Sequence, residues 1–362
     1  MNEKILTVSL PGRSYHIEME RGLLSRTGER CRAILPSAKR LFVVTDVCVA
    51  SLYGSQVEDS LKAAGFQVRT KVIPAGEESK NAWQLAELWE EMMAFGLTRT
   101  DAVIALGGGV VGDLAGFAAA TILRGVGFVQ IPTTLLAQVD ASVGGKVAID
   151  LRAGKNLAGA FWQPRGVLID PECLRTLSDR AFSDGMAEVI KYGCICDAGF
   201  FRLLDQYGGR TGVMEHIDQV IYTCCDIKRK LVLSDERDTG QRMILNFGHT
   251  IGHAFELAGR FETWTHGQSV AAGMNWAAQL GVKLGVTPPD VVASVQKVLK
   301  RYGLPLDLPC PWETLVEAVG LDKKNSGEDI YLIVLEELGR AVRRKLPRSE
   351  LLGLLQILLH GR

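Results

Sequence analysis

The sequence predicts two domains: an N-terminal α/β domain at residues 1–177, with a mostly parallel, Rossmann-like sheet, and a mostly helical C-terminal domain at residues 178–362. Two observations lead to this prediction. Short apolar runs alternate with amphipathic helical stretches throughout the first half, as in doubly wound sheets. Beyond residue 177 one helical pattern follows another, with few strand signals.

The strands expected in the first domain are short. YHIEM (15–19) alternates, with Tyr15, Ile17 and Met19 on one face. In DAVIAL (101–106) every residue after Asp101 is apolar, as expected of a buried strand. The other expected strands are LFVVTD (41–46), VRTKVI (68–73), GFVQIP (127–132) and GVLID (166–170), and NAWQLAELWEEMMAFG (81–96) is the clearest amphipathic helix. Such a sheet places ligands at the carboxyl ends of its strands.

The second domain has two further local signals. IYLIVL (330–335), followed by Gly339, is typical of a small hairpin. SELLGLLQILL (349–359) predicts a closing amphipathic helix with Ser349 as its N-cap. A cleft between the two domains is the expected place for a functional site.

Composition excludes several classes of protein. Lysine plus arginine and aspartate plus glutamate both number 41, so the formal net charge is zero and no basic stripe indicates nucleic-acid binding. No window has the roughly 18 consecutive apolar residues of a membrane span, and the N-terminus lacks a secretory pattern. The eight cysteines form no C-x-x-C pair. We therefore expect a cytoplasmic protein with free thiols and no membrane or nucleic-acid partner.

A glycine-rich turn follows the strand at 101–106. Gly107, Gly109 and Gly112 match G-x-G-x-x-G at the start of a helix, where backbone N–H groups and the helix dipole bind a pyrophosphate. The acidic residue expected about 20 positions later is missing, and Asp46 or Glu77 can replace it. The sequence thus predicts a variant dinucleotide site. The alternative is a tight strand–helix turn without a ligand.

The segment PTT (132–134) follows the next strand. Thr133 or Thr134 can cap the following helix, and the same hydroxyl groups can bind a ligand.

Three residues suggest a metal site. Glu188, His249 and His266 provide two imidazoles and one carboxylate, a ligand set that leaves coordination positions open, as catalytic zinc requires. The alternatives are ordinary: Glu188 can pair with Lys191 on a solvated helix face, and His249 can bond a carbonyl in the core.

His249 and His253 lie four residues apart and share a helix face. Thr250 stands where the metalloprotease pattern H-E-x-x-H requires glutamate, so that class does not fit. The remaining histidines, His16, His216 and His360, are expected to be solvated.

Basic residues recur beside glycines and polar turns, although the protein as a whole is neutral. If they converge, they form a pocket for a small, multiply charged anion, with arginine giving bidentate contacts and lysine point charges. The alternative is scattered, solvated charge. The residues concerned are Lys80, Arg124, Lys146, Lys155, Lys191, Lys228 and Arg242.

Six stretches together resemble the 3-dehydroquinate synthase family of sugar-phosphate cyclases, in the family's order and along nearly the whole chain. They are GGGVVGDLAGF, PTTLLAQVDASVGGK, GKNLAGAFWQP, GMAEVIKYG, DERDTGQRMILNFGHTIGHAFE and HGQSVAAGM.

The resemblance implies a reaction and its cofactors. The family converts 3-deoxy-D-arabino-heptulosonate 7-phosphate to 3-dehydroquinate and phosphate, the second step of the shikimate pathway to chorismate and the aromatic amino acids. It does so by transient oxidation with NAD, β-elimination of phosphate, reduction, ring opening and aldol closure. It uses NAD and one divalent metal, zinc or cobalt, and acts as a homodimer.

The resemblance also implies roles for individual residues. The metal ligands would be Glu188, His249 and His266. The NAD site would comprise Asp46, Gly76, Glu77, Lys80, Gly108, Gly109, Val110, Val111, Gly112, Asp113, Thr133, Thr134, Lys146, Lys155 and Thr176. The residues that hold substrate would be Arg124, Asp140, Lys146, Asn156, Lys191, Lys228, Arg242, Asn246 and His253, with Lys323 or Lys324.

Two positions depart from the usual family pattern. Val147 follows the lysine of GGK, where the family often has threonine, and Asp150 stands where it often has asparagine. The other functions to weigh are sister cyclases acting on other sugar phosphates, metal-dependent NAD alcohol dehydrogenases, and a non-catalytic NAD- or metal-binding protein.

Overall fold

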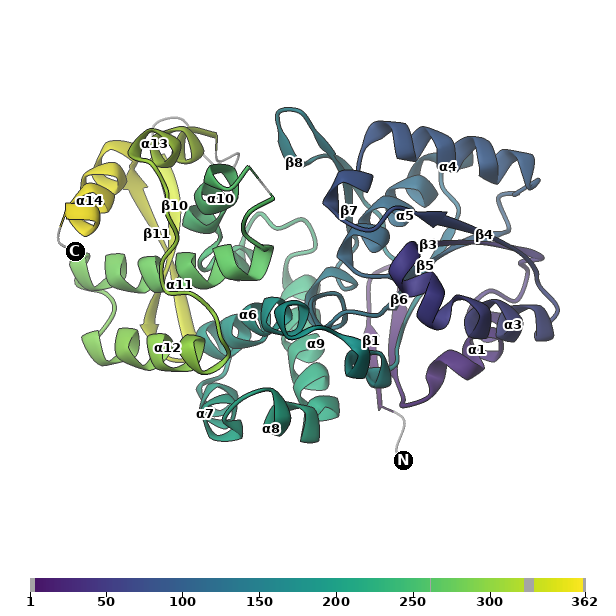
Figure 1. The fold of residues 1–362 in the computed structure, drawn as a ribbon, viewed down its shortest axis with the longest axis horizontal. Helices are drawn as coiled ribbons and strands as arrows, with labels where there is room; N and C mark the ends of the chain where they lie inside the picture. Colours follow the sequence, from purple (N-terminus) through teal and green to yellow (C-terminus); the bar gives the residue numbers. More distant parts are fainter. Residues whose placement is uncertain (1–3, 261, 322–328, 361–362) are drawn as a thin grey trace. The chain divides into compact units, whose positions relative to one another are not determined.

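The computed structural model describes residues 4–260, 262–321 and 329–360, in two compact units (Figure 1). The first unit comprises Met1–Ser178 and Ile221–Arg237, and the second comprises Asp179–Val220 and Asp238–Arg362. The sequence suggested two domains that are each continuous in the chain. In the structure, however, the segment Ile221–Arg237 returns to the first unit. Side chains of this segment explain the return, since the Cys225 thiol donates to the Gln138 carbonyl at 3.2 Å.

The first unit is built on a seven-stranded sheet with the order β1-β2-β9-β6-β5-β3-β4. All neighbouring strands are parallel except the antiparallel edge pair β1 and β2. The strands are β1 (Lys4–Val8), β2 (Tyr15–Met19), β3 (Arg40–Asp46), β4 (Gln67–Ile73), β5 (Ala102–Gly107), β6 (Gly127–Pro132) and β9 (Gly166–Ile169). The expected mostly parallel sheet is confirmed, and β1 is an addition to it.

The strand order locates a ligand-binding position. The segment β4-β3-β5-β6-β9 has the doubly wound order 2-1-3-4-5, in which the chain reverses direction between β3 and β5. Ligands bind outside the carboxyl ends of the strands at such a switch point. These ends carry Asp46 and Gly107.

Helices cover both faces of this sheet (Figure 1). On one face α4 (Ala82–Ala94) and α5 (Gly109–Thr121) pack on Phe42, Val44 and Val103. On the other face α1 (Thr27–Ile34) and α3 (Ser55–Ala63) pack on Leu41, Val43 and Ile104. Every residue of β5 is buried, as its unbroken apolar run predicted. A single short turn of helix, α2 (Val47–Val49), follows β3.

A hairpin of β7 (Lys146–Leu151) and β8 (Gly154–Phe161) was not predicted from the sequence. Its inner residues Val147 and Ile149 join the core beneath α5. Gly159 is required because a Cβ there would lie 2.3 Å from the Val147 carbonyl oxygen. The glycine and lysine content of both strands hides their pattern from sequence reasoning.

The second unit contains the helices α6 (Asp179–Cys196), α7 (Ala198–Tyr207), α8 (Arg210–Glu215), α10 (His249–Ala258), α11 (His266–Lys283), α12 (Pro289–Arg301), α13 (Trp312–Leu321) and α14 (Arg348–His360). Helix α9 (Ile217–Ser234) begins in this unit and continues into the first. The small hairpin expected from IYLIVL (330–335) and Gly339 is confirmed, since β10 (Asp329–Glu337) and β11 (Arg340–Pro347) pair as antiparallel strands. The second unit is thus mostly, but not entirely, helical. Ile330, Leu332 and Val334 of β10 pack into the same core as Trp276 and Leu280 of α11.

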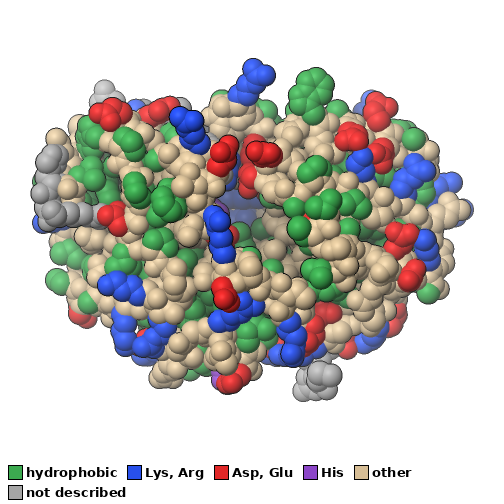
Figure 2. Space-filling model, in the orientation of Figure 1, with side chains coloured by type: hydrophobic (Ala, Val, Ile, Leu, Met, Phe, Trp, Pro, Cys, Tyr) green, Lys and Arg blue, Asp and Glu red, His purple; other side chains and the backbone are tan. Residues whose placement is uncertain are grey.

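The expected N-cap at Ser349 is wrong. Helix α14 begins at Arg348, directly after β11, so Ser349 lies in the first helical turn. Among the described residues, no helix is long and apolar enough to cross a membrane. Acidic and basic side chains are interspersed over the face shown in Figure 2, in keeping with the zero net charge.

Candidate active site

The glycine-rich turn lies at the switch point, between β5 and α5. Gly108 is the N-cap of α5 and has no side chain to cap it. A Cβ on Gly108 would lie 3.2 Å from the Thr134 side chain, and a Cβ on Gly112 would lie 2.8 Å from Gln130 Oε1 on β6. The glycines therefore bring the helix close to the sheet and leave backbone N–H groups at the helix start available to a phosphate.

The two threonines after β6 differ in their surroundings. The Thr134 hydroxyl accepts a hydrogen bond from the Ala137 N–H at 3.2 Å, as expected of a cap. The Thr133 hydroxyl is buried and has no hydrogen-bond partner among the described residues. A buried, unpartnered hydroxyl beside an uncapped helix start is an available ligand contact.

Asp46 ends β3 at the other side of the switch point. Its Oδ1 atom caps α2, accepting from the Cys48 and Val49 N–H groups at 2.8 and 2.9 Å. Both bonds use the same oxygen, so the capping role and a ligand role at Oδ2 are compatible.

A network of charged side chains surrounds the buried ammonium of Lys80. Its ammonium lies 2.9 Å from Glu77, 3.1 Å from Asp113 and 3.7 Å from Asp150. Burial opposes the charge on Lys80, but these three carboxylates outweigh burial and raise its pKa. Burial raises the pKa of Asp113 to about 6, against the opposing effect of Lys80. Lys155 extends the network, 3.7 Å from Glu77.

The network joins separate parts of the first unit. Glu77 and Lys80 follow β4, Asp113 belongs to α5, and Asp150 and Lys155 belong to the β7–β8 hairpin. Asp150 also accepts a hydrogen bond from the Asn156 N–H at 2.7 Å, which fixes a residue with φ of 56°. The position that departs from the family pattern is thus built into the network.

In the second unit, the three expected metal ligands come together. Glu188 lies in α6, His249 is the first residue of α10, and His266 is the first residue of α11. Glu188 Oε1 lies 3.3 Å from His266 Nε2 and 3.6 Å from His249 Nε2. One ligand atom from each residue lies within 4.8 Å of the others, which fits a single divalent ion.

Both alternatives considered for these residues are partly realised. Glu188 does form an ion pair with Lys191, but both side chains are almost fully buried, so the face is not solvated. His249 Nδ1 does lie 3.2 Å from the Phe247 carbonyl, and this bond leaves Nε2 directed at Glu188.

Glycines set the distance between the two histidine-bearing helices. A Cβ on Gly273 of α11 would lie 2.0 Å from the Gly248 carbonyl oxygen, and one on Gly252 of α10 would lie 3.0 Å from the Ser269 carbonyl oxygen. Gly248 adopts φ of 82° at the start of α10. The close approach of the backbones brings His249 and His266 to a ring-centroid separation of 5.4 Å.

The two histidines have opposite electrostatic environments. Burial, helped by the positive charge of Lys191, holds the pKa of His249 well below its ordinary value, so its ring is neutral. Burial acts the same way on His266, but hydrogen bonds and negative charge from Glu188 and Glu256 outweigh it and raise the pKa. The position of His266 between Glu188 and Glu256 therefore favours a positive charge, whereas the position of His249 does not.

Four expected substrate residues lie on elements that contact the cluster. Lys191 follows Glu188 by one turn, and the His253 ring lies edge-on to His249 with centroids 5.8 Å apart. Arg242 and Asn246 lie in the short turn η7 (Gln241–Asn246), which packs against α6. Arg242 is only 1 % exposed.

The remaining expected residues that the structure describes lie in the first unit. The buried Lys228 ammonium of α9 lies 2.9 Å from the carboxylate of the partly exposed Asp140. Lys146 and Asn156 lie exposed on the β7–β8 hairpin, Arg124 is exposed after α5, and the Thr176 hydroxyl bonds the Tyr53 hydroxyl at 2.7 Å. Lys323 and Lys324 lie outside the described residues.

Sequence reasoning missed Glu256, a buried carboxylate that lies 3.1 Å from His266 Nδ1. Its signal was present: it follows His249 by two helical turns and stands between the apolar residues Phe255 and Leu257.

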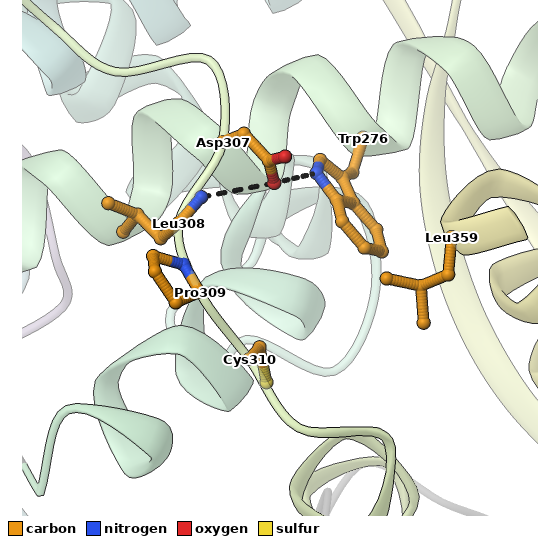
Figure 3. A pocket seen from close by; sticks show the side chains of 6 residues that line it. All are labelled: Trp276, Asp307, Leu308, Pro309, Cys310 and Leu359. Atoms are coloured by element: carbon orange, nitrogen blue, oxygen red, sulfur yellow. Dashed lines mark hydrogen bonds between the residues drawn. The ribbon is translucent and has the colours of Figure 1, made fainter. Parts of the chain in front are cut away.

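A separate cavity of about 300 Å³ lies in the second unit (Figure 3). It is lined by Trp276, Asp307, Leu308, Pro309, Cys310 and Leu359. The Trp276 indole donates to Asp307 at 3.0 Å across it. No residue expected in the functional site lines this cavity.

The first unit is doubly wound and carries a glycine-rich loop, and the second carries a cluster of two histidines and one carboxylate. Together in one chain, these two features define a class of enzyme that combines a dinucleotide with a metal. The chain matches the family models described as 3-dehydroquinate synthase N-terminal, over residues 70–184, and 3-dehydroquinate synthase C-terminal, over residues 185–325. It is 45 % identical to the 3-dehydroquinate synthase of Clostridium botulinum, over 93 % of this chain and 97 % of the relative. The chain belongs to the 3-dehydroquinate synthase family.

Solved structures share the fold. The 2-epi-5-epi-valiolone synthase of Streptomyces hygroscopicus, which contains NAD⁺ and Zn²⁺, is 27 % identical with a TM-score of 0.87, covering 98 % of this chain and 99 % of that one. An iron-containing alcohol dehydrogenase of Thermotoga maritima is 15 % identical with a TM-score of 0.66, covering 92 % of this chain and 95 % of that one. The latter likeness concerns the fold alone.

Proposed function

We propose that this chain is a phosphate lyase that converts 3-deoxy-D-arabino-heptulosonate 7-phosphate to 3-dehydroquinate and phosphate, with NAD and a divalent zinc or cobalt ion. The observation that carries the proposal is the cluster of Glu188, His249 and His266 with the buried cation Lys191 beside it. Membership of the family supports the choice of reaction, and the resemblance also leads us to propose a cytoplasmic homodimer.

Both cofactors fit residues of this chain. Glu188, His249 and His266 would hold the metal, with positions left open for substrate oxygens. Gly108–Asp113, Thr133 and Thr134 would hold the pyrophosphate, with Asp46 and the network of Glu77, Lys80 and Lys155 around the rest of the dinucleotide. When bound, NAD supplies a hydride acceptor that later returns the hydride, and the metal supplies a Lewis acid for ring hydroxyls.

The chain's own residues would position and stabilise charge. The substrate carries a phosphate and a carboxylate, so it needs cations held in fixed places. Lys191, Lys228 and Arg242 are each almost fully buried, and desolvated cations attract an anion more strongly than exposed ones. We assign these three, with Lys146 and Arg124, to the anionic groups of the substrate.

The polar residues would orient the ring. Asn246 and His253 lie on elements that carry or contact metal ligands, and we assign them to substrate hydroxyl groups. Asp140 holds the Lys228 ammonium, and Asn156 is fixed by Asp150 at its backbone. Precise placement of this kind is the main contribution that a protein makes when cofactors carry the chemistry.

The proposal is tested by release of phosphate from the heptulosonate phosphate in the presence of NAD. We expect release to stop when a chelator removes the metal and to return when zinc or cobalt is added. The Glu188→Gln variant should lose this activity, whereas Asp307→Asn, a change in the same unit away from the cluster, should keep it. Release from a different sugar phosphate, with none from this one, would instead identify a sister cyclase.

A further inference from the structure

A second carboxylate stands behind the metal cluster. Glu256 of α10 is 4 % exposed, and its Oε1 atom lies 3.1 Å from His266 Nδ1. The opposite nitrogen of the same ring, Nε2, lies 3.3 Å from Glu188. The His266 ring therefore spans two carboxylates, one on each side.

We infer that Glu256 is a positioning residue that fixes His266 for metal binding through Nε2. An imidazole that offers the Nε2 lone pair to a metal must carry its hydrogen on Nδ1, and the Glu256 carboxylate accepts that hydrogen. The bond sets the tautomer and the orientation of the ring at once. The inference rests on the proposed metal site.

The contrast with His249 shows why the charge on Glu256 matters. His249 Nδ1 lies 3.2 Å from the neutral carbonyl of Phe247. His266 instead has a charged acceptor, which makes its ring a stronger donor to a metal ion. The carboxylate also offsets the buried positive charge that a divalent ion and Lys191 bring to this place.

The position of Glu256 on the helix explains how it reaches His266. It lies seven residues after His249, which places both on the same face of α10. At the start of α11, the Thr265 capping box and the Asp184 carboxylate, which accepts from the Gly267 N–H at 2.5 Å, hold the backbone around His266. The backbone is thus held independently of Glu256, which acts on the ring.

The test measures zinc affinity by competition with a chromophoric chelator for the parent, Glu256→Gln and Asp307→Asn. Glutamine carries no charge, and because its amide can present either the oxygen or the NH₂ group to the ring, it no longer fixes the hydrogen on Nδ1. We expect Glu256→Gln to bind zinc about 10- to 100-fold more weakly, the usual effect of removing such a partner, with an altered visible spectrum of the cobalt form. Asp307→Asn, which changes a carboxylate that accepts from Trp276 in the same unit, should bind zinc as the parent does.

Each outcome has a distinct meaning. A parent that binds no zinc would overturn the proposed metal site itself. A parent that binds zinc, with a Glu256→Gln variant of equal affinity, would overturn only the role of Glu256. If Glu256→Gln does not fold, the parent alone can be tested by NMR after labelling its histidines with ¹⁵N and loading it with zinc. Both metal-bound rings should then carry hydrogen on Nδ1. A metal-bound ring with hydrogen on Nε2 would contradict the inference.

Discussion

The Gly273→Ala substitution tests how the metal cluster is assembled. A Cβ at this position would lie 2.0 Å from the Gly248 carbonyl oxygen and 2.8 Å from the Gly252 N atom, where ordinary contact begins at 3.4 Å. Both neighbours are backbone atoms of α10, so no side chain can rotate away. Helices α10 and α11 must separate by about 1 Å or more. Overpacking of this kind lowers the free energy of unfolding by about 1–3 kcal/mol.

The separation acts directly on metal binding. His249 follows Gly248, and His266 begins the helix that carries Gly273. Metal–ligand distances tolerate changes of only about 0.2 Å, so a displacement near 1 Å should lower zinc affinity by at least about tenfold. The measurement is zinc titration with the same chelator, together with thermal unfolding of the metal-free protein.

Gly353→Ala is the matched control. Gly353 lies inside α14, and a Cβ there meets nothing within 4 Å. Alanine should therefore stabilise that helix by about 0.5–1 kcal/mol and leave zinc affinity unchanged. A Gly273→Ala protein that binds zinc as tightly as the parent would refute the reasoning that close helix packing forms the site.

Three other predictions follow from local contacts. Asp101→Asn should lower stability by about 1–3 kcal/mol. The amide NH₂ of asparagine would face the Thr98 N–H and hydroxyl groups, which now donate hydrogen bonds to the carboxylate. Burial raises the pKa of Asp101 in the folded protein, but hydrogen bonds outweigh burial and lower it. In urea unfolding, the parent should therefore be more stable than the variant above pH 3.8, the ordinary pKa of the group, and should lose this difference as the pH falls through the lower folded pKa. Thr133→Val should leave stability nearly unchanged. It should weaken NAD binding about 3- to 10-fold, measured by calorimetry, because it removes a buried hydroxyl that is available to the ligand. Unchanged NAD affinity would exclude that contact. Brief alkylation at neutral pH should modify the exposed Cys48 and spare Cys225. Burial raises the pKa of the Cys225 thiol to about 12, so this thiol stays neutral until strongly alkaline pH. Early labelling of Cys225, detected by mass spectrometry, would contradict this prediction.

Sequence periodicity predicted the parts of the fold that bury an unbroken or alternating apolar pattern. Strand β5 is apolar throughout and was predicted within one residue of its bounds. The β7–β8 hairpin was missed because Lys146, Gly154 and Gly159 interrupt its pattern, although Val147 and Ile149 enter the core. The return of α9 to the first unit depends on contacts such as that of Cys225 with Gln138, which no local pattern encodes.

The same distinction applies to the site. The residue types of Glu188, His249 and His266 indicated a metal, but their proximity depends on how α6, α10 and α11 pack. Gly273 carries no chemistry of its own, and only the structure shows that it sets the approach of the two helices. Glu256 lies two helical turns after His249, but this spacing belongs to no recognised metal motif, so its role emerged only from its contact with His266.

The central claim is that NAD acts here as a catalyst with no net oxidation of the substrate. The most direct test supplies the zinc-loaded enzyme with heptulosonate phosphate and a trace of NAD, and follows phosphate and NADH absorbance together. We predict many phosphates released per NAD, with no accumulation of NADH. NADH that rises in step with loss of substrate, and stops when the NAD is consumed, would contradict the claim and indicate a dehydrogenase.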